Sequence, residues 1–310
     1  MTRKKPWRSP GLLLLLLLFL LGVAMTFSTF AEPTLPPADP ERITVSGISS
    51  GGAMAQQLQF AFADRFSGAG IIAGVPFGCA EGDVGLALGR CMGMGEEDLP
   101  VEQFQIALAA LASRGKVADA SHLARHRAWI FHGSLDAAVG EKSTAATAAM
   151  YDSVLPPPRT VYVNDVPAAH LFPTLDSGGD CAQAAPPWLG ACGYDAAGEM
   201  LSFLYPGLTP PSVSDRAPAA EGEFLELTVP GAAEAGLAES ALAWFPPSCP
   251  PEGCRLHLAL HGCAMSTAQN GNAFVEEAGY LPWARANRIV LLFPQVEAQV
   301  INPLGCWDWW

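Results

Sequence analysis

The sequence predicts an α/β fold built as one large domain, and three observations predict it. The chain has 310 residues, half of them hydrophobic, which is enough to bury the core of a full domain. Apolar runs of strand length alternate with longer segments of helical spacing, as in strand-helix-strand units. Only 15% of the residues are charged, which excludes a disordered chain.

The first 31 residues are expected to lie outside this domain. Four basic residues precede the leucine-rich run at 12–21, and Thr29-Phe30-Ala31 places small residues at the two cleavage positions, as in a secretory signal peptide. We expect cleavage after Ala31, so that residues 32–310 are secreted to the periplasm or the medium, with no membrane association. The alternative is an uncleaved membrane anchor, because the apolar run nearly reaches spanning length.

The charge of the chain argues against nucleic acid as a partner. Asp and Glu number 30 against 17 Lys and Arg, a net charge of −13 at pH 7. Loss of residues 1–31 removes four basic residues and no acidic one, which takes the charge from −13 to −17. A chain this acidic repels a phosphate backbone.

Eight cysteines behind a secretory leader indicate disulfides rather than metal ligands. Their even number requires no free thiol, and no CxxC spacing favours a zinc ribbon or a thioredoxin-type redox site. Every pairing is formally possible. The short gaps favour three bridges and leave two cysteines to pair across a longer loop: Cys79 with Cys91, Cys181 with Cys192, Cys249 with Cys254, and Cys263 with Cys306.

Segment 43–54 reads ITVSGISSGGAM, and its Gly47-Ile48-Ser49-Ser50-Gly51 core is a GxSxG nucleophile elbow. A β-branched run leads into it and a helix-compatible sequence follows, so the serine is expected at a tight turn between a strand and a helix. Glycines on either side permit the sharp bend. The first amides of the helix favour an oxyanion beside the serine. We therefore predict that Ser49 is a nucleophile.

Beyond the elbow the sequence predicts alternating helices and strands. In the first half we expect helices at 53–66, 101–114 and 141–155, strands at 68–74, 127–131 and 159–163, and a disulfide-stapled loop at 76–98. In the second half we expect a loop-rich stretch at 171–198, a Pro/Ala-rich connector at 206–222, strands at 223–229, 241–245, 256–260 and 289–293, and a helix at 272–287.

Two predicted strands end just before residues of catalytic type, Asp136 and His170. Because ligands collect at the carboxyl ends of strands in open α/β sheets, both side chains are expected on one rim with Ser49. The order serine, aspartate, histidine is that of the hydrolases. The alternatives are a helix cap for Asp136, a plain loop position for His170, and Asp165 as the acid.

The last strand-helix-strand unit has an unusual position in the chain. Its first strand runs into His261-Gly262-Cys263. In the usual α/β-hydrolase order, a strand that ends in His-Gly precedes the elbow and supplies the second oxyanion donor, whereas here it follows all three catalytic candidates. A circular permutation explains this, since the termini of compact domains often lie close together. We therefore predict an α/β-hydrolase fold, circularly permuted, as a single domain with disulfide-stapled loops.

Together these segments resemble the circularly permuted, type II catalytic domains of extracellular polyhydroxybutyrate (PHB) depolymerases, which are secreted α/β-hydrolase esterases. The resemblance covers most of the mature chain. In that family the chain continues past the last of these segments through another helix, so we expect that this sequence is truncated or lacks the helix. Six segments carry the resemblance: VSGISSGGAMA at the elbow, GCA at 78–80, FHGSLDAAV around Asp136, His170 with Phe172-Pro173-Thr174, LALHGC at 258–263, and NPLGCWDWW at 302–310.

The resemblance implies a secreted serine esterase that hydrolyses PHB-type polyester to hydroxyacid oligomers and monomers through an acyl-enzyme. It implies no cofactor and no metal. The expected partner is the insoluble polyester, and we expect a monomer. Exposed tryptophans would adsorb to the polymer, with Trp188, Trp307, Trp309 and Trp310 as candidates. The implied roles are Ser49 as nucleophile, Asp136 and His170 as its partners, the amides of Ser50 and Cys263 as the oxyanion hole, and Trp307 in the cleft near the scissile ester.

Several alternatives accompany these expectations, among them Ser49 as a plain turn serine and Trp307 as part of the core. The same triad would serve a secreted esterase for feruloyl or acetyl groups on plant polysaccharide, and a non-catalytic polymer-adsorbing protein is an alternative of another class. His122 and His126 are spaced for one helical face, but Leu123 replaces the glutamate of HExxH, so a solvated face is favoured over zinc. His132 and His261 precede glycines at strand ends and are expected to shape turns, with His261 supporting the oxyanion loop.

Overall fold

The computed structural model describes residues 38–93, 99–217 and 222–310, and residues 36–310 form one compact unit. The expected signal peptide, residues 1–31, lies outside the described residues. None of the helices in the described segments has the length and hydropathy needed to cross a membrane.

The described chain is organised around an eight-stranded sheet in the order β4-β3-β2-β1-β10-β11-β9-β8. Six strands run parallel, while β9 pairs antiparallel with β11, and β8 antiparallel with β9. The strands are β1 (Ala38–Ile48), β2 (Gly68–Ile72), β3 (Arg127–Phe131), β4 (Thr160–Val163), β8 (Glu223–Thr228), β9 (Ser240–Phe245), β10 (Cys254–Leu260) and β11 (Ile289–Phe293).

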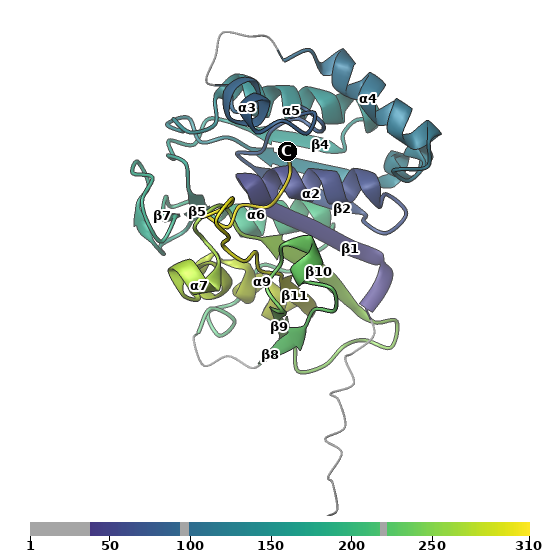
Figure 1. Cartoon of the computed structure of the whole chain (residues 1–310). Helices are drawn as coiled ribbons and strands as arrows, with labels where there is room; N and C mark the ends of the chain where they lie inside the picture. The colour runs from purple at the N-terminus through teal and green to yellow at the C-terminus, as the bar shows by residue number, and fades with distance from the viewer. Residues whose placement is uncertain (1–37, 94–98, 218–221) are drawn as a thin grey trace, which may run out of the picture. The chain divides into compact units, whose positions relative to one another are not determined.

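The centre of the sheet joins the two ends of the chain. Strand β10 pairs with β1, with Ser46 opposite Ala259 and Gly47 opposite Leu260, and Figure 1 shows the green β10 beside the purple β1. The strand that ends in His261-Gly262 therefore lies next to the strand that ends in the elbow, although it comes much later in the sequence. This is the circularly permuted α/β-hydrolase arrangement that the sequence predicts.

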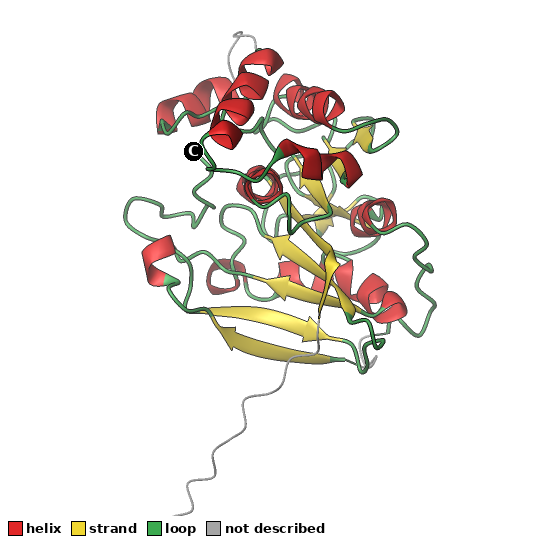
Figure 2. Cartoon of the chain, turned by 90° about the vertical axis from the view of Figure 1, so that its right-hand side faces the viewer, coloured by secondary structure: helices red, strands yellow, loops and turns green. Residues whose placement is uncertain are grey.

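Helices cover both faces of the sheet (Figure 2). Successive residues of β2 point to opposite faces: a Cβ added to Gly70 would meet Met200 of α6, whereas one added to Gly52 of α2 would meet Ile71. The helical segments are α2 (Ser50–Ala61), α3 (Val84–Leu86), η1 (Ala87–Cys91), α4 (Val101–Ser113), η2 (Ala120–Arg125), α5 (Glu141–Val154), α6 (Ala196–Leu204), η3 (Ala233–Ala235), α7 (Thr267–Asn270), α8 (Ala273–Glu277) and α9 (Tyr280–Asn287).

Two regions differ from the elements that the sequence predicts. The helix expected at 272–287 is divided into α8 and α9 at Gly279, whose φ of 88° is left-handed and ends the first helix. The stretch 171–198 is not only loop, because it holds a small sheet in the order β5-β7-β6 and leads into α6. Its strands are β5 (Phe172–Thr174), β6 (Gly179–Asp180) and β7 (Leu189–Ala191).

A chain of buried polar groups crosses from β1 to β10 in the core. Tyr205 donates its hydroxyl hydrogen to the Leu256 carbonyl, 2.7 Å away, and so accepts from Thr44, also at 2.7 Å. His257 then donates from Nδ1 to Thr44 and accepts at Nε2 from Ser46, both at 2.7 Å. Because burial lowers the pKa of His257 to about 3, its imidazole stays neutral and can fill both roles.

Candidate active site

Ser49 lies at the turn between β1 and α2 in a conformation that side chains rarely adopt. Its φ is 58° and its ψ is −120°, and its amide is held by a 2.8 Å hydrogen bond to the Ile72 carbonyl. A residue in such a conformation costs about 1–3 kcal/mol and persists where the surroundings enforce it. They do so here through close backbone contacts: a Cβ on Gly47 would lie 2.3 Å from the Gly51 carbonyl, and one on Gly51 2.4 Å from the His261 oxygen.

Asp136 and His170 form a hydrogen-bonded pair between the loops that follow β3 and β4. His170 Nδ1 lies 2.8 Å from Asp136 Oδ2, and the other carboxylate oxygen accepts the amides of Ala138 and Val139 at 2.8 and 2.9 Å. Burial alone would raise the pKa of Asp136, but the hydrogen bond and charge of His170 and these two amides outweigh it and lower the pKa. The carboxylate therefore stays ionised and orients Nδ1–H of the imidazole toward itself.

Ser49 and His170 line one cavity of about 390 Å³. Within the described residues the Ser49 hydroxyl makes no hydrogen bond, so the structure brings the two side chains to a common cavity without joining them directly. Hydrogen bonds between catalytic groups are often long when no substrate is bound. The imidazole keeps Nε2 free for the serine, because Nδ1 is engaged by Asp136.

The two amides expected to stabilise an oxyanion come from opposite ends of the chain. Ser50 is the first residue of α2, so its N–H has no acceptor four residues earlier in the helix. Cys263 follows β10, and its N–H has no acceptor in the part of the chain that the structure describes. Both residues line the cavity that holds Ser49. This arrangement can stabilise a tetrahedral oxyanion beside the serine.

His261 supports the loop that carries Cys263 and does not line the cavity. Its Nε2 accepts the Val296 amide at 3.2 Å, so Nδ1 carries the hydrogen and donates to the Gly262 carbonyl at 2.7 Å. Burial lowers the pKa of His261 to about 4, which keeps the ring neutral. His132 is also buried, and burial lowers its pKa. Both histidines have the environment of structural groups rather than of a general base.

The structure places Trp307 differently from the sequence expectation. Trp307 is only 6% exposed and lines a neighbouring cavity instead of the one with Ser49, whose walls include Trp309 and Trp310. The reason is a hydrogen bond: its indole Nε1 donates to the His261 carbonyl at 2.9 Å, which turns the ring toward the loop after β10. Trp307 thus supports this loop and does not line the cleft.

The four expected disulfides are present. The pairs are Cys79–Cys91, Cys181–Cys192, Cys249–Cys254 and Cys263–Cys306. The first and last of them anchor two walls of the Ser49 cavity, because Cys263 and Cys306 line it together with residues of the 79–91 loop. The alternative acid, Asp165, is exposed and makes no hydrogen bond to His170.

Aliphatic side chains at the mouth of the cavity escaped the sequence interpretation. Val84 and Leu88 come from the 79–91 loop, and Ile301 and Leu304 from the segment before Cys306; all four line the cavity and are at least 49% exposed. The spacing of Val84 and Leu88 on one helical face was the signal in the sequence. We call these four residues, together with the adjacent and 99% exposed Val300, the aliphatic rim.

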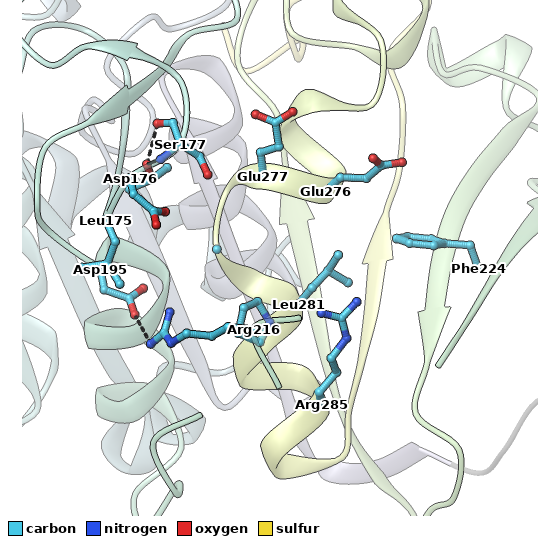
Figure 3. Close-up of a pocket in the computed structure, with 13 residues that line it drawn as sticks. Leu175, Asp176, Ser177, Asp195, Arg216, Phe224, Glu276, Glu277, Leu281 and Arg285 are labelled. Atoms are coloured by element: carbon cyan, nitrogen blue, oxygen red, sulfur yellow. Dashed lines mark hydrogen bonds and ion pairs between the residues drawn. The ribbon is translucent and has the colours of Figure 1, made fainter. Parts of the chain in front are cut away.

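A second cavity, of about 560 Å³, lies between α6, α8, α9 and β8 (Figure 3). None of the predicted site residues lines it. One pair of its charges is engaged: Arg216 lies 3.6 Å from Asp195, which also accepts from the α6 amide of Gly198 and from Trp283. Arg285 donates to backbone carbonyls of the connector. The cavity pairs no nucleophile with a base and therefore does not compete as the active site.

The chain is similar to known polyhydroxybutyrate depolymerases. No family model matches the chain. It is 34% identical over 296 residues to a poly(3-hydroxybutyrate) depolymerase of Delftia acidovorans, across 94% of this chain but only 58% of that protein. It is 30% identical to a polyhydroxybutyrate depolymerase of Talaromyces funiculosus, across 93% of this chain and 88% of the relative.

Solved structures point the same way. The crystal structure of the PHB depolymerase from Penicillium funiculosum matches with a TM-score of 0.80 and 28% identity, over 88% of this chain and 89% of that one. A PHB depolymerase variant complexed with an R3HB trimer matches with the same TM-score and identity, over 88% of each chain. With an identity of 30% across most of a relative's length, this chain belongs to the polyhydroxybutyrate depolymerase family.

Proposed function

We propose that the chain is a secreted serine esterase that hydrolyses PHB-type polyester to hydroxyacid oligomers and monomers. One observation carries the proposal: a strained elbow serine shares a cavity with a histidine that is held by a buried carboxylate. The names of two relatives with 30 and 34% identity support the substrate class. The chain spans little more than half of the Delftia protein. The proposed activity therefore rests on the residues of this chain.

The proposed reaction proceeds through an acyl-enzyme. His170 Nε2 removes the proton from Ser49 Oγ as the oxygen attacks the ester carbonyl, and Asp136 stabilises the imidazolium that forms. The amides of Ser50 and Cys263 donate hydrogen bonds to the negatively charged carbonyl oxygen and stabilise it. His170 then protonates the departing alcohol, and a water molecule, activated by the same imidazole, hydrolyses the acyl-enzyme. The residues supply this chemistry without a metal or an organic cofactor.

The walls of the cavity favour an apolar polyester over a sugar ester. Apart from the catalytic groups, the cavity is lined mainly by alanine, valine, leucine, isoleucine, methionine and tryptophan side chains. A polysaccharide would need several polar groups to bind its hydroxyls. We propose that the aliphatic rim adsorbs to the insoluble polymer, with Trp309 and Trp310 in the cavity behind it. This replaces the proposed role of Trp307, which is buried.

Cleavage of residues 1–31, secretion of residues 32–310 as one domain and a monomeric state belong to the same proposal. The four disulfides support an oxidising compartment, because such bonds form and persist outside the cytosol. Mass spectrometry of the secreted protein tests the cleavage after Ala31, and light scattering tests the monomer.

The decisive experiment replaces the nucleophile. Ser49→Ala is expected to lower kcat on a soluble short-chain ester and on dispersed PHB granules by about 10⁶-fold, while the exposed Ser153→Ala leaves both unchanged. A fluorophosphonate should label the wild-type protein once and the Ser49 variant not at all. Absence of labelling in oxidised wild-type protein would favour a non-catalytic adsorbing protein. Faster cleavage of feruloyl or acetyl sugar esters than of granules would favour the polysaccharide esterase.

A further inference from the structure

The side chain of Ser50 occupies a place that the mechanism above does not explain. Ser50 is 3% exposed, and its hydroxyl accepts the backbone N–H of Trp307 at 3.3 Å. It also lies 3.4 Å from Cys263 Sγ. Because Cys263 is bridged to Cys306 and has no S–H, the hydroxyl is the donor in that contact. One small polar group thus touches both the loop after β10 and the C-terminal segment.

These two segments are joined to each other at several points. The bridge Cys263–Cys306 has a Cα–Cα distance of 4.3 Å, the Ala264 amide donates to the Leu304 carbonyl at 2.6 Å, and the Trp307 indole donates to the His261 carbonyl. The segments 261–264 and 304–307 therefore behave as one body. Within the described residues, the Ser50 hydroxyl makes the polar contact between this body and the first turn of α2, while further along α2 Gln57 donates to the Trp309 carbonyl.

We propose that the Ser50 hydroxyl is a positioning group that fixes the distance between the two oxyanion amides, its own and that of Cys263. This inference rests on the proposed ester hydrolysis. One amide moves with α2 and the other with the body formed by 261–264 and 304–307, so their separation depends on what joins the two. Rates fall steeply when a catalytic group is misplaced by about 1 Å. The bridge Cys263–Cys306 also helps to fix this distance, because it holds the sulfur atom that the Ser50 hydroxyl contacts.

The first test separates positioning from folding. Ser50→Ala keeps its amide and is expected to lower kcat on a soluble short-chain ester by 10- to 100-fold, with KM within twofold of the wild-type value. Binding of a phenylboronic acid, which forms a tetrahedral adduct with the serine, should weaken by at least tenfold. The melting temperature should stay close to that of Ser143→Ala, a control that removes another buried hydroxyl, one bonded to the Cys91 carbonyl.

The second test asks whether Ser50 acts through the bridge. The double variant Cys263→Ala, Cys306→Ala is expected to lower kcat as Ser50→Ala does, and all three changes together should cost hardly more than either alone. The distant bridge serves as the control: Cys249→Ala with Cys254→Ala should leave kcat unchanged. Fully multiplicative losses would overturn the coupling between Ser50 and the bridge.

An unchanged kcat and boronate affinity in Ser50→Ala would overturn the inference. A melting temperature that falls well below that of Ser143→Ala, together with losses in kcat and boronate affinity, would also overturn it. If Ser50→Ala does not fold, Ser50→Thr keeps the hydroxyl and is expected within fivefold of wild-type kcat, and a larger loss in folded protein would contradict the proposal. The Ser49→Ala variant distinguishes failure of this inference from failure of the proposed function. If that variant retains ester hydrolysis, the function fails. If it is inactive and Ser50→Ala is normal, only the inference fails.

Discussion

The two halves of the sheet contribute different things to the candidate active site. The first half, β1 to β4, positions the side chains that are proposed to react: Ser49 at the end of β1, and Asp136 and His170 after β3 and β4. The second half, from β8 to the C-terminal segment, contributes a backbone amide at Cys263 and one wall of the cavity, at 301–304, 306 and 309–310, while another wall, with Val84 and Leu88, comes from the first half. Side-chain chemistry is visible in residue types, whereas backbone chemistry depends on which strands lie side by side.

Two histidines show this difference. His170 and His261 both come after strands that end on the rim of the sheet, yet only His170 is partly exposed in the cavity and paired with a carboxylate. His261 is fully buried, and its ring nitrogens contact backbone groups. Position after a strand is thus not sufficient to identify a general base, because burial and hydrogen-bond partners decide which imidazole can accept a proton.

After replacement of the nucleophile, the largest expected effect comes from replacing the acid in the first half. Asp136→Asn should lower kcat by about 10⁴-fold, because the amide holds the imidazole in the wrong tautomer for accepting the serine proton. The neighbouring Asp165→Asn provides the control, since Asp165 is exposed and should be replaceable without loss. Steady-state kinetics on a soluble ester compare kcat of the two variants. A large loss in the Asp165 variant, with Asp136→Asn active, would assign the acid to the other residue.

The next effect concerns the contact between the two halves of the sheet, where α2 packs against the end of β10. Gly51→Ala would place a Cβ 2.4 and 2.5 Å from the carbonyl oxygens of His261 and Leu260, which must then move away from α2. We expect the free energy of unfolding to fall by about 2–3 kcal/mol, with a loss of activity, as for overpacked cores. Gly89→Ala is the matched control, since its added Cβ meets nothing within 4 Å. Denaturant unfolding that gives equal stabilities for both variants would show that the halves are not held this closely.

A smaller effect concerns pH and the buried His257 between the halves. The unfolded chain binds a proton at the ordinary pKa of 6.5, whereas burial lowers the folded pKa to about 3. The unfolded state therefore binds more protons in this window, and stability falls as the pH falls from 6.5 toward 3. His257 should contribute a slope that approaches about 1.4 kcal/mol per pH unit as the pH falls below 6.5. Urea unfolding of His257→Gln between pH 7 and 5 should show this slope removed, whatever the absolute stability. An unchanged slope would mean that His257 is charged in the folded protein.

The smallest effect concerns the aliphatic rim. Val300→Ser removes a 99% exposed valine that does not line the cavity, so kinetics on a soluble ester should not change. Adsorption to a PHB film should weaken by about threefold to tenfold, given that burying a valine is worth about 1.5 kcal/mol. The connector residue Val213, 89% exposed, gives the same chemical change elsewhere as Val213→Ser. Equal adsorption of both variants would locate the polymer contact on another surface.

The sequence predicted most of the fold, and its failures have physical reasons. Strands β3 and β11 coincide with the expected ranges, because each is a short β-branched or aromatic run bounded by turn residues. Helix α6 was missed because it is only nine residues long and directly follows a loop-rich stretch, although its less buried residues Glu199, Ser202 and Phe203 share one helical face. The break at Gly279 depends on a left-handed conformation that a glycine permits but does not require.

The sequence predicted the functional side chains of the candidate site better than it predicted the residues that form the cavity walls. The elbow motif and the order of Asp136 and His170 sufficed to place three side chains on one rim. The orientation of Trp307 could not be derived, because it depends on a hydrogen bond to the carbonyl of a residue 46 positions earlier. The role of the Ser50 hydroxyl likewise depends on a contact that spans 213 positions.

The pairing of β1 with β10 also has a consequence for how the chain reaches its fold. The residues that meet in the middle of the sheet, such as Thr44 and His257, are separated by 213 positions. A nascent chain that has emerged from the ribosome only as far as β4 lacks the neighbour of its elbow strand. High contact order of this kind delays the cooperative folding step, since a long loop must close before the contacts form. The nucleophile turn therefore gains its neighbouring strand only after β10 has been synthesised.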